Sequence, residues 1–178
     1  MPRKPITPEN AFLRLATLCA RSEQAEGDLR KKLHDWGLTE SDSDDIIARL
    51  KQERYLDNER YARAYCRDKL RFNGWGRIKI AFMLRGKDIE QEYIDAALAE
   101  INEEQYASIL EDALIAKAKT LIGKSDEQMQ VSLLRFASSR GFEQSAIFRA
   151  MTRISSPSKI EGAGGSMRTQ EISLRNED

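Results

Sequence analysis

Residues 55–89 read YLDNERYARAYCRDKLRFNGWGRIKIAFMLRGKDI and contain the clearest helix signals in the chain. Asp57 predicts a helix start, because an aspartate at the N-cap accepts hydrogen bonds from the free N–H groups of the first turn. Leu56 and Tyr61 stand at the two positions of a hydrophobic staple around this cap. The three residues are therefore expected to shape the fold of this segment and not to contact a partner.

A break follows the helix that begins here. Gly74 predicts the helix end, because glycine readily adopts the left-handed conformation that closes helices, and the next helix is expected to open at Gly76. Similar start and stop signals along the whole chain predict an all-α protein. The expected helices span 9–20, 41–54, 58–72, 77–87, 90–101, 103–122, 126–140 and 143–153, with a further helix capped by Ser22 and ending at Gly37.

The predicted helices form three triplets with equivalent positions. The aligned residues are Leu29, Ile80 and Leu133 in the core and Gly37, Asp88 and Gly141 at the turns. One such unit buries little surface alone, so we expect stacked units in an elongated, curved array that flexes between them. The predicted segments are a flexible lead at 1–8, repeats at 9–54, 55–102 and 103–154, and a disordered Ser/Gly-rich tail at 155–178.

Composition excludes several protein classes. Charged residues make up 33% of the 178 residues, and no stretch reaches the ~18 apolar residues that a membrane span needs. The N-terminus lacks the apolar segment of a signal peptide, so the protein is expected to be soluble and cytoplasmic. Cys19, Cys66 and the lone His34 lack the short spacing of a zinc site. With no phosphate loop, activated nucleophile or metal cluster in the sequence, we expect neither enzymatic activity nor a cofactor.

The net charge is zero, but the charges are segregated along the chain. Residues 60–87 contain nine basic residues and one acid, Asp68, whereas residues 88–112 contain nine acids and no Lys or Arg. The basic segment predicts a surface for a polyanion, and a solvated helix face is the plainer alternative for each block. The candidate binding residues are Arg63, Arg67, Lys69, Arg71, Arg77, Lys79, Arg85 and Lys87, with a smaller patch at Arg30, Lys31 and Lys32.

Several motifs resemble those of the RecX family of bacterial regulatory proteins. They are Leu29-Arg30-Lys31-Lys32-Leu33, Tyr55-Leu56-Asp57-Asn58-Glu59-Arg60-Tyr61-Ala62, Gly74-Trp75-Gly76 with Lys79-Ile80-x-x-x-Leu84-x-x-Lys87-x-Ile89, and Arg135-Phe136-x-x-x-Arg140-Gly141-Phe142. The motifs stand in the family's order and cover about residues 10–154.

The resemblance implies an all-α regulator of three tandem three-helix repeats without enzymatic activity. It further implies binding in the groove of the RecA recombinase filament, which restrains recombination, ATP hydrolysis and the coprotease activity behind the SOS response. Binding to single- and double-stranded DNA is also implied by the resemblance. We expect a monomer without a membrane partner. A sequence-independent DNA-binding module that has no filament partner is the alternative.

Two residues depart from the family pattern. Asp88 replaces the family's usual glycine at a turn, and Gly27 lies inside the second helix, where glycine costs about 0.5–1 kcal/mol relative to alanine. Ile78 and Phe82 form a second apolar strip on helix 77–87, for which we expect burial and keep a docking face as the alternative. Trp75 is expected to pack at the corner between two helices rather than to anchor a partner.

Overall fold

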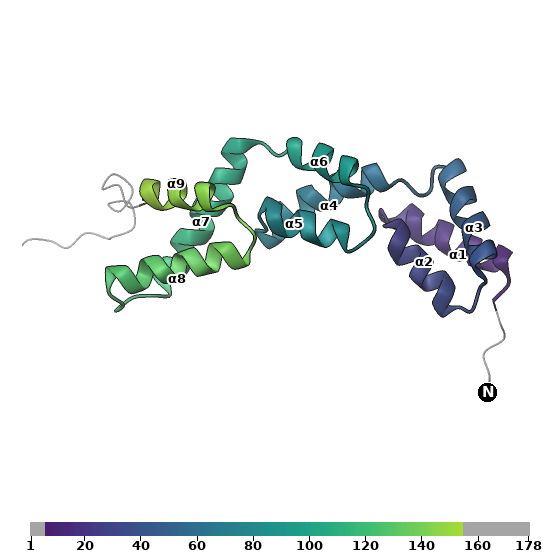
Figure 1. Cartoon of the computed structure of the whole chain (residues 1–178), viewed down its shortest axis with the longest axis horizontal. Coiled ribbons are helices and arrows are strands. Elements are labelled where there is room, and N and C mark those ends of the chain that lie inside the picture. Colours follow the sequence, from purple (N-terminus) through teal and green to yellow (C-terminus); the bar gives the residue numbers. More distant parts are fainter. Residues whose placement is uncertain (1–5, 155–178) are drawn as a thin grey trace, which may run out of the picture.

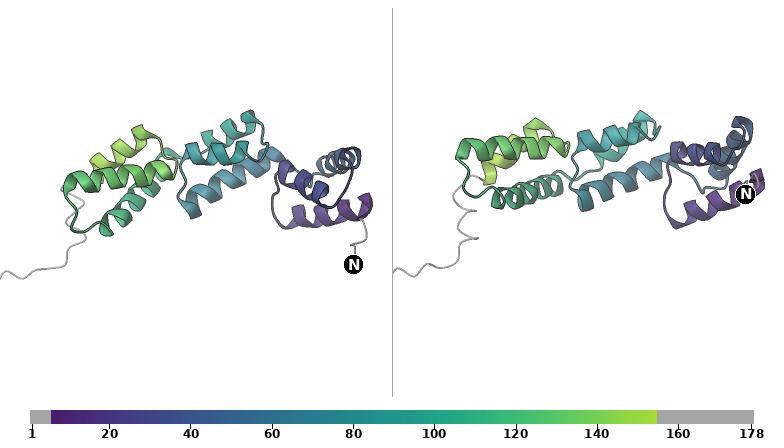
Figure 2. Two further views of the ribbon diagram at one scale, coloured as in Figure 1. Left: turned by 60° about the horizontal axis from the view of Figure 1, so that its bottom comes forward. Right: turned by 90° about the horizontal axis from the view of Figure 1, so that it is seen from below.

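The fold is a row of helices, seen in a computed structural model that describes residues 6–154. Within this range nine helices follow one another in three groups along the long axis of an elongated molecule (Figures 1 and 2). The groups are α1 (Pro8–Arg21), α2 (Glu26–Asp35) and α3 (Glu40–Gln52), then α4 (Asn58–Asn73), α5 (Arg77–Arg85) and α6 (Gln91–Ala99), and finally α7 (Glu103–Lys119), α8 (Asp126–Ser139) and α9 (Gln144–Ile154).

The predicted all-α fold of three tandem three-helix repeats is thus confirmed. We propose that the repeats have the limits 9–54, 55–102 and 103–154. Most of the expected lead at 1–8 and all of the expected disordered tail at 155–178 lie outside the described residues.

The helix signals around α4 act largely as predicted. Asp57 is the N-cap and accepts a hydrogen bond from the Arg60 N–H at 2.9 Å. Gly74 closes the helix with a φ of 58°, and Gly76 is the N-cap of α5. The staple is wrong, because Leu56 and Tyr61 are buried in separate hydrophobic clusters. Leu56 instead helps to end α3, since its N–H donates to the Leu50 carbonyl oxygen at 3.2 Å.

The expected cap at Ser22 is also wrong. Ser22 ends α1, where its N–H donates to the Leu18 carbonyl oxygen, and α2 starts only after Ala25. A distant side chain replaces the missing local cap, because the Asn58 side-chain oxygen accepts from the Glu26 N–H at 3.2 Å. The free N–H groups at the start of a helix need such an acceptor. For α2 the acceptor comes from Asn58, which belongs to the second group of helices.

Equivalent turns follow the second helix of each group, as the alignment predicts. Gly37, Asp88 and Gly141 have φ values of 80°, 58° and 79°, all in the left-handed region. The next residue in each case donates its N–H to a carbonyl of the preceding helix, at 3.2 to 3.3 Å. Asp88 therefore keeps the backbone geometry of the two glycines, although a side chain in this region is unfavourable.

Buried apolar side chains form two separate clusters. The first cluster joins α1, α2 and α3. The second cluster runs without interruption from α4 to α9 and also takes in Ala25, just before α2. The second and third groups therefore share one core, whereas the first group has its own. The sequence predicts flexing between any two repeats, and the shared core of the second and third groups differs from that expectation.

The second and third groups meet through their backbones. The Gly76 N–H donates to the Arg140 carbonyl oxygen at 2.8 Å, and the Ile78 N–H donates to the Gly141 carbonyl oxygen at 3.0 Å. A Cβ atom on Gly76 would lie 2.2 Å from the Gly141 oxygen, and one on Gly141 would lie 2.3 Å from the Lys79 Cβ atom. Such distances leave room only for glycine at both positions.

The first and second groups meet mainly through polar side chains. The contacts are Arg60 to Glu23 at 2.5 Å, Lys87 to Asp28 at 2.5 Å, and the Glu26 N–H to the Asn58 side-chain oxygen at 3.2 Å. A Cβ atom on Gly27 would lie 2.8 Å from both Asp88 Oδ2 and the Lys87 carbonyl oxygen. The two departures from the family pattern, Gly27 and Asp88, therefore face each other, and the missing side chain of Gly27 makes room for that turn.

Glu26 lies at the start of α2 with its carboxylate 2.5 Å from Lys51 Nζ and 2.8 Å from Arg30 Nε. Burial by itself would raise the pKa of Glu26, but the hydrogen bonds and charges of Lys51 and Arg30 lower it overall. A lowered carboxyl pKa stabilises the fold above the ordinary value of about 4.3, and this contribution is lost as the pH falls through the folded-state pKa.

We expect Glu26→Gln to lower the free energy of unfolding at pH 7, because the uncharged amide loses both charge pairs. Urea denaturation at pH 7 and pH 3 measures this, and the gap between wild type and variant should narrow at pH 3. Glu127→Gln is the matched control, since Glu127 is exposed and has no ion pair among the described residues. An equal difference in the free energy of unfolding between wild type and Glu26→Gln at both pH values would contradict the stabilising role of the Glu26 charge.

Candidate partner-binding surfaces

Four of the predicted binding cations are used inside the fold. Arg63 pairs with Glu59 at 2.7 Å and Glu100 at 3.0 Å. The other three pairings are Arg77 with Glu103 and Glu143, Lys87 with Asp28, and Arg30 with Glu26 and Asp44. Each of these side chains is already neutralised by acids from its own or a neighbouring helix, so it offers less charge to a partner.

Arg77 belongs to a buried polar contact that the sequence did not predict. The Tyr106 hydroxyl accepts from the Arg77 N–H at 3.1 Å and donates to Glu143 at 2.5 Å. Burial and the hydrogen bond to Glu143 raise the pKa of Tyr106, so the phenol stays protonated and remains a donor. This contact ties α5 to α7 and α9 and supports the backbone junction.

The remaining cations of the segment lie on different sides of α4 and α5. Lys69 and Lys79 approach the Trp75 ring, with their Nζ atoms 5.3 Å and 4.7 Å from its centroid. Lys79 also donates to the Ser139 carbonyl oxygen at 3.4 Å. We call this area, formed by Lys69, Trp75 and Lys79, the Trp75 face. Trp75 itself is half-buried against the second cluster, as its predicted packing role requires.

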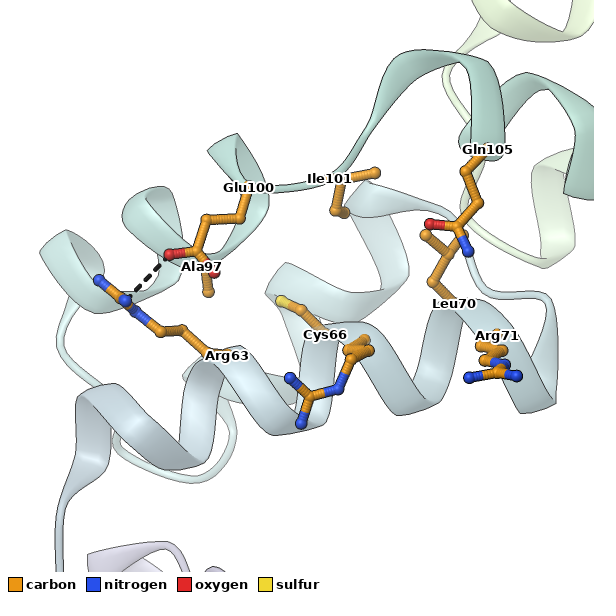
Figure 3. Close-up of a pocket in the computed structure, with 9 residues that line it drawn as sticks. Arg63, Cys66, Leu70, Arg71, Ala97, Glu100, Ile101 and Gln105 are labelled. Carbon is orange, nitrogen blue, oxygen red and sulfur yellow. Dashed lines mark ion pairs between the residues drawn. The ribbon is translucent and has the colours of Figure 1, made fainter.

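Arg63, Arg67 and Arg71 lie on another side of α4, spaced one helical turn apart. They border a cleft of about 160 Å³ between α4, the end of α6 and the start of α7 (Figure 3). We call it the α4 cleft. Its lining is Arg63, Cys66, Arg67, Leu70, Arg71, Ala97, Glu100, Ile101 and Gln105.

Three predicted cations lie away from both areas. Arg85 at the end of α5 donates to the Gln91 side chain at 2.9 Å. Lys31 and Lys32 are exposed on α2, in the first group of helices. The predicted binding residues therefore do not gather into a single patch, because α4 turns its cations to different sides.

The predicted burial of Ile78 and Phe82 is wrong. Their side chains are 57% and 70% exposed. The short helix α5 buries Ile80, Ala81 and Leu84, and this side suffices to pack it against α4 and α6. The second strip is left facing solvent.

Sequence reasoning missed the uncharged lining of the α4 cleft. Cys66 and Leu70 alternate with the three arginines on one side of α4, and this spacing was visible in the sequence. Ala97, Ile101 and Gln105 carried no such signal, because the third helix and the start of the next group meet α4 only in the folded chain.

Residues 6–154 contain neither a membrane-spanning helix nor a metal-binding cluster. No helix there is long and apolar enough to cross a membrane. No group of three or more His, Cys, Asp or Glu side chains in that range is arranged to hold a metal ion.

Comparisons with known proteins point to one family. The family model for the second three-helix domain of RecX matches residues 57–98. Regulatory protein RecX of Clostridium perfringens (strain 13 / Type A) is 26% identical over 164 residues, which cover 89% of this chain and 76% of that protein. RecX of Mannheimia succiniciproducens is 27% identical over 133 residues, covering 74% and 86%.

A solved structure shares the fold. The crystal structure of RecX from Lactobacillus salivarius aligns with a TM-score of 0.74 at 16% identity, covering 83% of this chain and 96% of that one. Residues 57–98 therefore form the second three-helix domain of the RecX family, and the chain is similar to RecX regulatory proteins over most of its length.

Proposed function

We propose that this protein is a cytoplasmic, monomeric regulator without enzymatic activity that binds the RecA filament on DNA and inhibits its ATPase, recombinase and coprotease activities. The observation that carries the proposal is the elongated row of three helix groups (Figure 1), whose middle group has cations without an ion pair among the described residues both at the Trp75 face and at the α4 cleft. A rod can follow a helical fibre over several subunits, and cations attract both DNA phosphates and acidic protein surfaces.

The two areas on α4 fit the two components of such a fibre. The Trp75 face combines an aromatic ring with two lysines, the pairing that single-stranded nucleic acid prefers. The α4 cleft offers guanidinium groups, which bind carboxylates as well as phosphates. A regulator that contacts DNA and protein together would hold neighbouring subunits in one arrangement and slow the cycle of ATP hydrolysis.

The Trp75 face also favours the second candidate, a DNA-binding module that acts without a filament. Filter binding to single- and double-stranded DNA, with and without RecA, separates the two. Binding that RecA strengthens supports the proposed regulator, and binding that RecA leaves unchanged supports the simpler module.

The central test is the ATPase activity of RecA filaments assembled beforehand on single-stranded DNA, titrated with this protein at about 50 and 200 mM salt. We expect inhibition whose half-maximal concentration rises about 5–10-fold at the higher salt, because few charge contacts are broken. The double variant Lys69→Glu with Lys79→Glu should raise the half-maximal concentration at the lower salt by at least the same factor. An unchanged ATPase at saturating protein would contradict the proposal.

Lys119→Glu with Lys124→Glu provides the matched control. Both lysines are exposed and have no ion pair among the described residues, so the change in net charge is identical. They lie at the end of α7 and in the loop before α8. If this control loses inhibition to the same degree, net charge and not the Trp75 face is responsible.

A further inference from the structure

We infer that the α4 cleft is a docking site for an acidic protein segment, which places one apolar side chain on the cleft floor and its carboxylates on Arg67 and Arg71. This inference deepens the proposed function and rests on it, because it assigns this cleft to the protein component of the fibre. Figure 3 shows the side chains around the cleft.

The floor of the cleft is apolar. Cys66, Leu70 and Ala97 are 1%, 4% and 2% exposed, and Ile101 is half-buried beside them. Burial raises the pKa of the Cys66 thiol to about 12, with a smaller effect from the Glu100 charge, so the sulfur is neutral. A volume of about 160 Å³ over such a floor suits an apolar side chain, which gains free energy by leaving water.

The rim of the cleft carries uncompensated positive charge. Arg63 is neutralised by Glu59 and Glu100, and its ion pair with Glu100 lies at one end of the cleft (Figure 3). Arg67 and Arg71 are exposed, and neither has an ion pair within residues 6–154. They stand one helical turn apart, so two carboxylates on an extended or helical segment can meet both guanidinium groups. Charge complementarity therefore requires an acidic occupant.

The lining favours protein over nucleic acid. None of its residues is aromatic, so a base would find no ring on which to stack. A phosphodiester would also gain nothing from a floor made of Cys66, Leu70 and Ala97. The Trp75 face supplies the ring and the lysines that a nucleic acid requires, and it lies on another side of α4.

The third group of helices provides an internal contrast. A cleft of about 130 Å³ lies between α7 and α9, lined in part by Arg149, Arg153 and Glu111. Glu111 is as far along α7 from the N-cap Asn102 as Cys66 is along α4 from the N-cap Asp57, so the two residues are equivalent. Its carboxylate pairs with Arg153 at 3.1 Å, so an ion pair stands where the second group has the apolar Cys66, and Arg153 is not free for a carboxylate of a partner. The docking chemistry is therefore specific to the second group.

The test compares Gln105→Trp with Gln128→Trp. Both glutamines are exposed and stand at the same place after an N-cap, Asn102 in one helix and Ser125 in the other. Only Gln105 borders the α4 cleft, and a tryptophan there would cover the floor without changing any charge. Each full-length variant is titrated with the peptide acetyl-Glu-Asp-Leu-Asp-Glu-amide, followed by amide chemical shifts in NMR spectra.

The wild type and Gln128→Trp should show saturable shifts for the amides of residues 66, 70 and 105, and Gln105→Trp should bind about tenfold more weakly or not at all. A peptide with alanine in place of leucine should also bind more weakly. Equal binding of the leucine and alanine peptides, no shifts in the wild type, or unaltered binding by Gln105→Trp would each overturn the inference.

Co-sedimentation with RecA filaments and filter binding to oligo(dT) connect the cleft to the proposed function. Gln105→Trp should lose about tenfold in filament affinity and keep its oligo(dT) affinity, whereas Gln128→Trp should keep both. If the wild type binds the peptide but no filament, the proposed function fails while the cleft assignment stands. If the wild type binds the filament and Gln105→Trp binds it equally well, the cleft assignment fails alone.

Discussion

Gly141→Ala is expected to lower the free energy of unfolding by about 2–5 kcal/mol, from about 1–2 kcal/mol for a left-handed residue with a side chain and about 1–3 kcal/mol for overpacking. Gly141 has a φ of 79°, and an added Cβ atom would lie 2.3 Å from the Lys79 Cβ atom and 2.4 Å from the Lys79 nitrogen. The backbone of α5 cannot retreat without breaking the hydrogen bonds from Gly76 and Ile78. Urea denaturation measures the loss.

Two other glycines separate the two causes. Gly37 has a φ of 80° but open space around its Cα atom, so Gly37→Ala should show only the backbone cost of about 1–2 kcal/mol. Gly86 has a φ of −66° and no heavy atom closer than 3.6 Å to an added Cβ, so Gly86→Ala should be nearly neutral. Equal losses at Gly37 and Gly141 would show that the close approach at the junction is unimportant.

Phe142→Ala is expected to cost about 3–5 kcal/mol, the usual range for a buried phenylalanine. Phe142 is 2% exposed and lies against the Tyr106 ring at a centroid distance of 5.2 Å, beside the junction of the second and third groups. Because these groups share one cluster, the loss should spread over both. Hydrogen exchange should speed up in the amides of α4 to α9 together and remain unchanged in α1 to α3.

Leu15→Ala is the reciprocal variant. Leu15 is fully buried in the first cluster, and its truncation should cost about 2–5 kcal/mol. Faster exchange is expected in α1 to α3 only. If either variant instead loosens all nine described helices equally, the two clusters unfold as one unit, and the separation of the cores has no energetic meaning.

The expected effects also bear on function. The rigid pair formed by the second and third groups presents the Trp75 face and the α4 cleft in a fixed relation. The first group is held by the contacts of Arg60 with Glu23, Lys87 with Asp28 and Asn58 with Glu26, and the two ion pairs among them weaken with salt. A variant that breaks these contacts between the first and second groups should therefore alter filament binding by changing the orientation of the first group, without changing the Trp75 face or the α4 cleft.

The sequence by itself determined the helices and their repetition. Asp57, Gly74 and Gly76 act through hydrogen bonds and backbone conformations within a few residues, so their effect can be predicted without a fold. The left-handed turns at Gly37, Asp88 and Gly141 recur for the same local reason. The family motifs follow these local signals and led to the same architecture.

Only the tertiary structure decided which side chains meet. Asn58 caps α2 from the next group, Leu56 and Tyr61 join different clusters, and Ile78 and Phe82 remain exposed, because each outcome depends on residues far away in the chain. The basic segment likewise became two separate areas only once Glu100, Glu103 and Asp28 were placed beside particular cations. Charge and periodicity are properties of one helix, whereas neutralisation and burial depend on what packs against it.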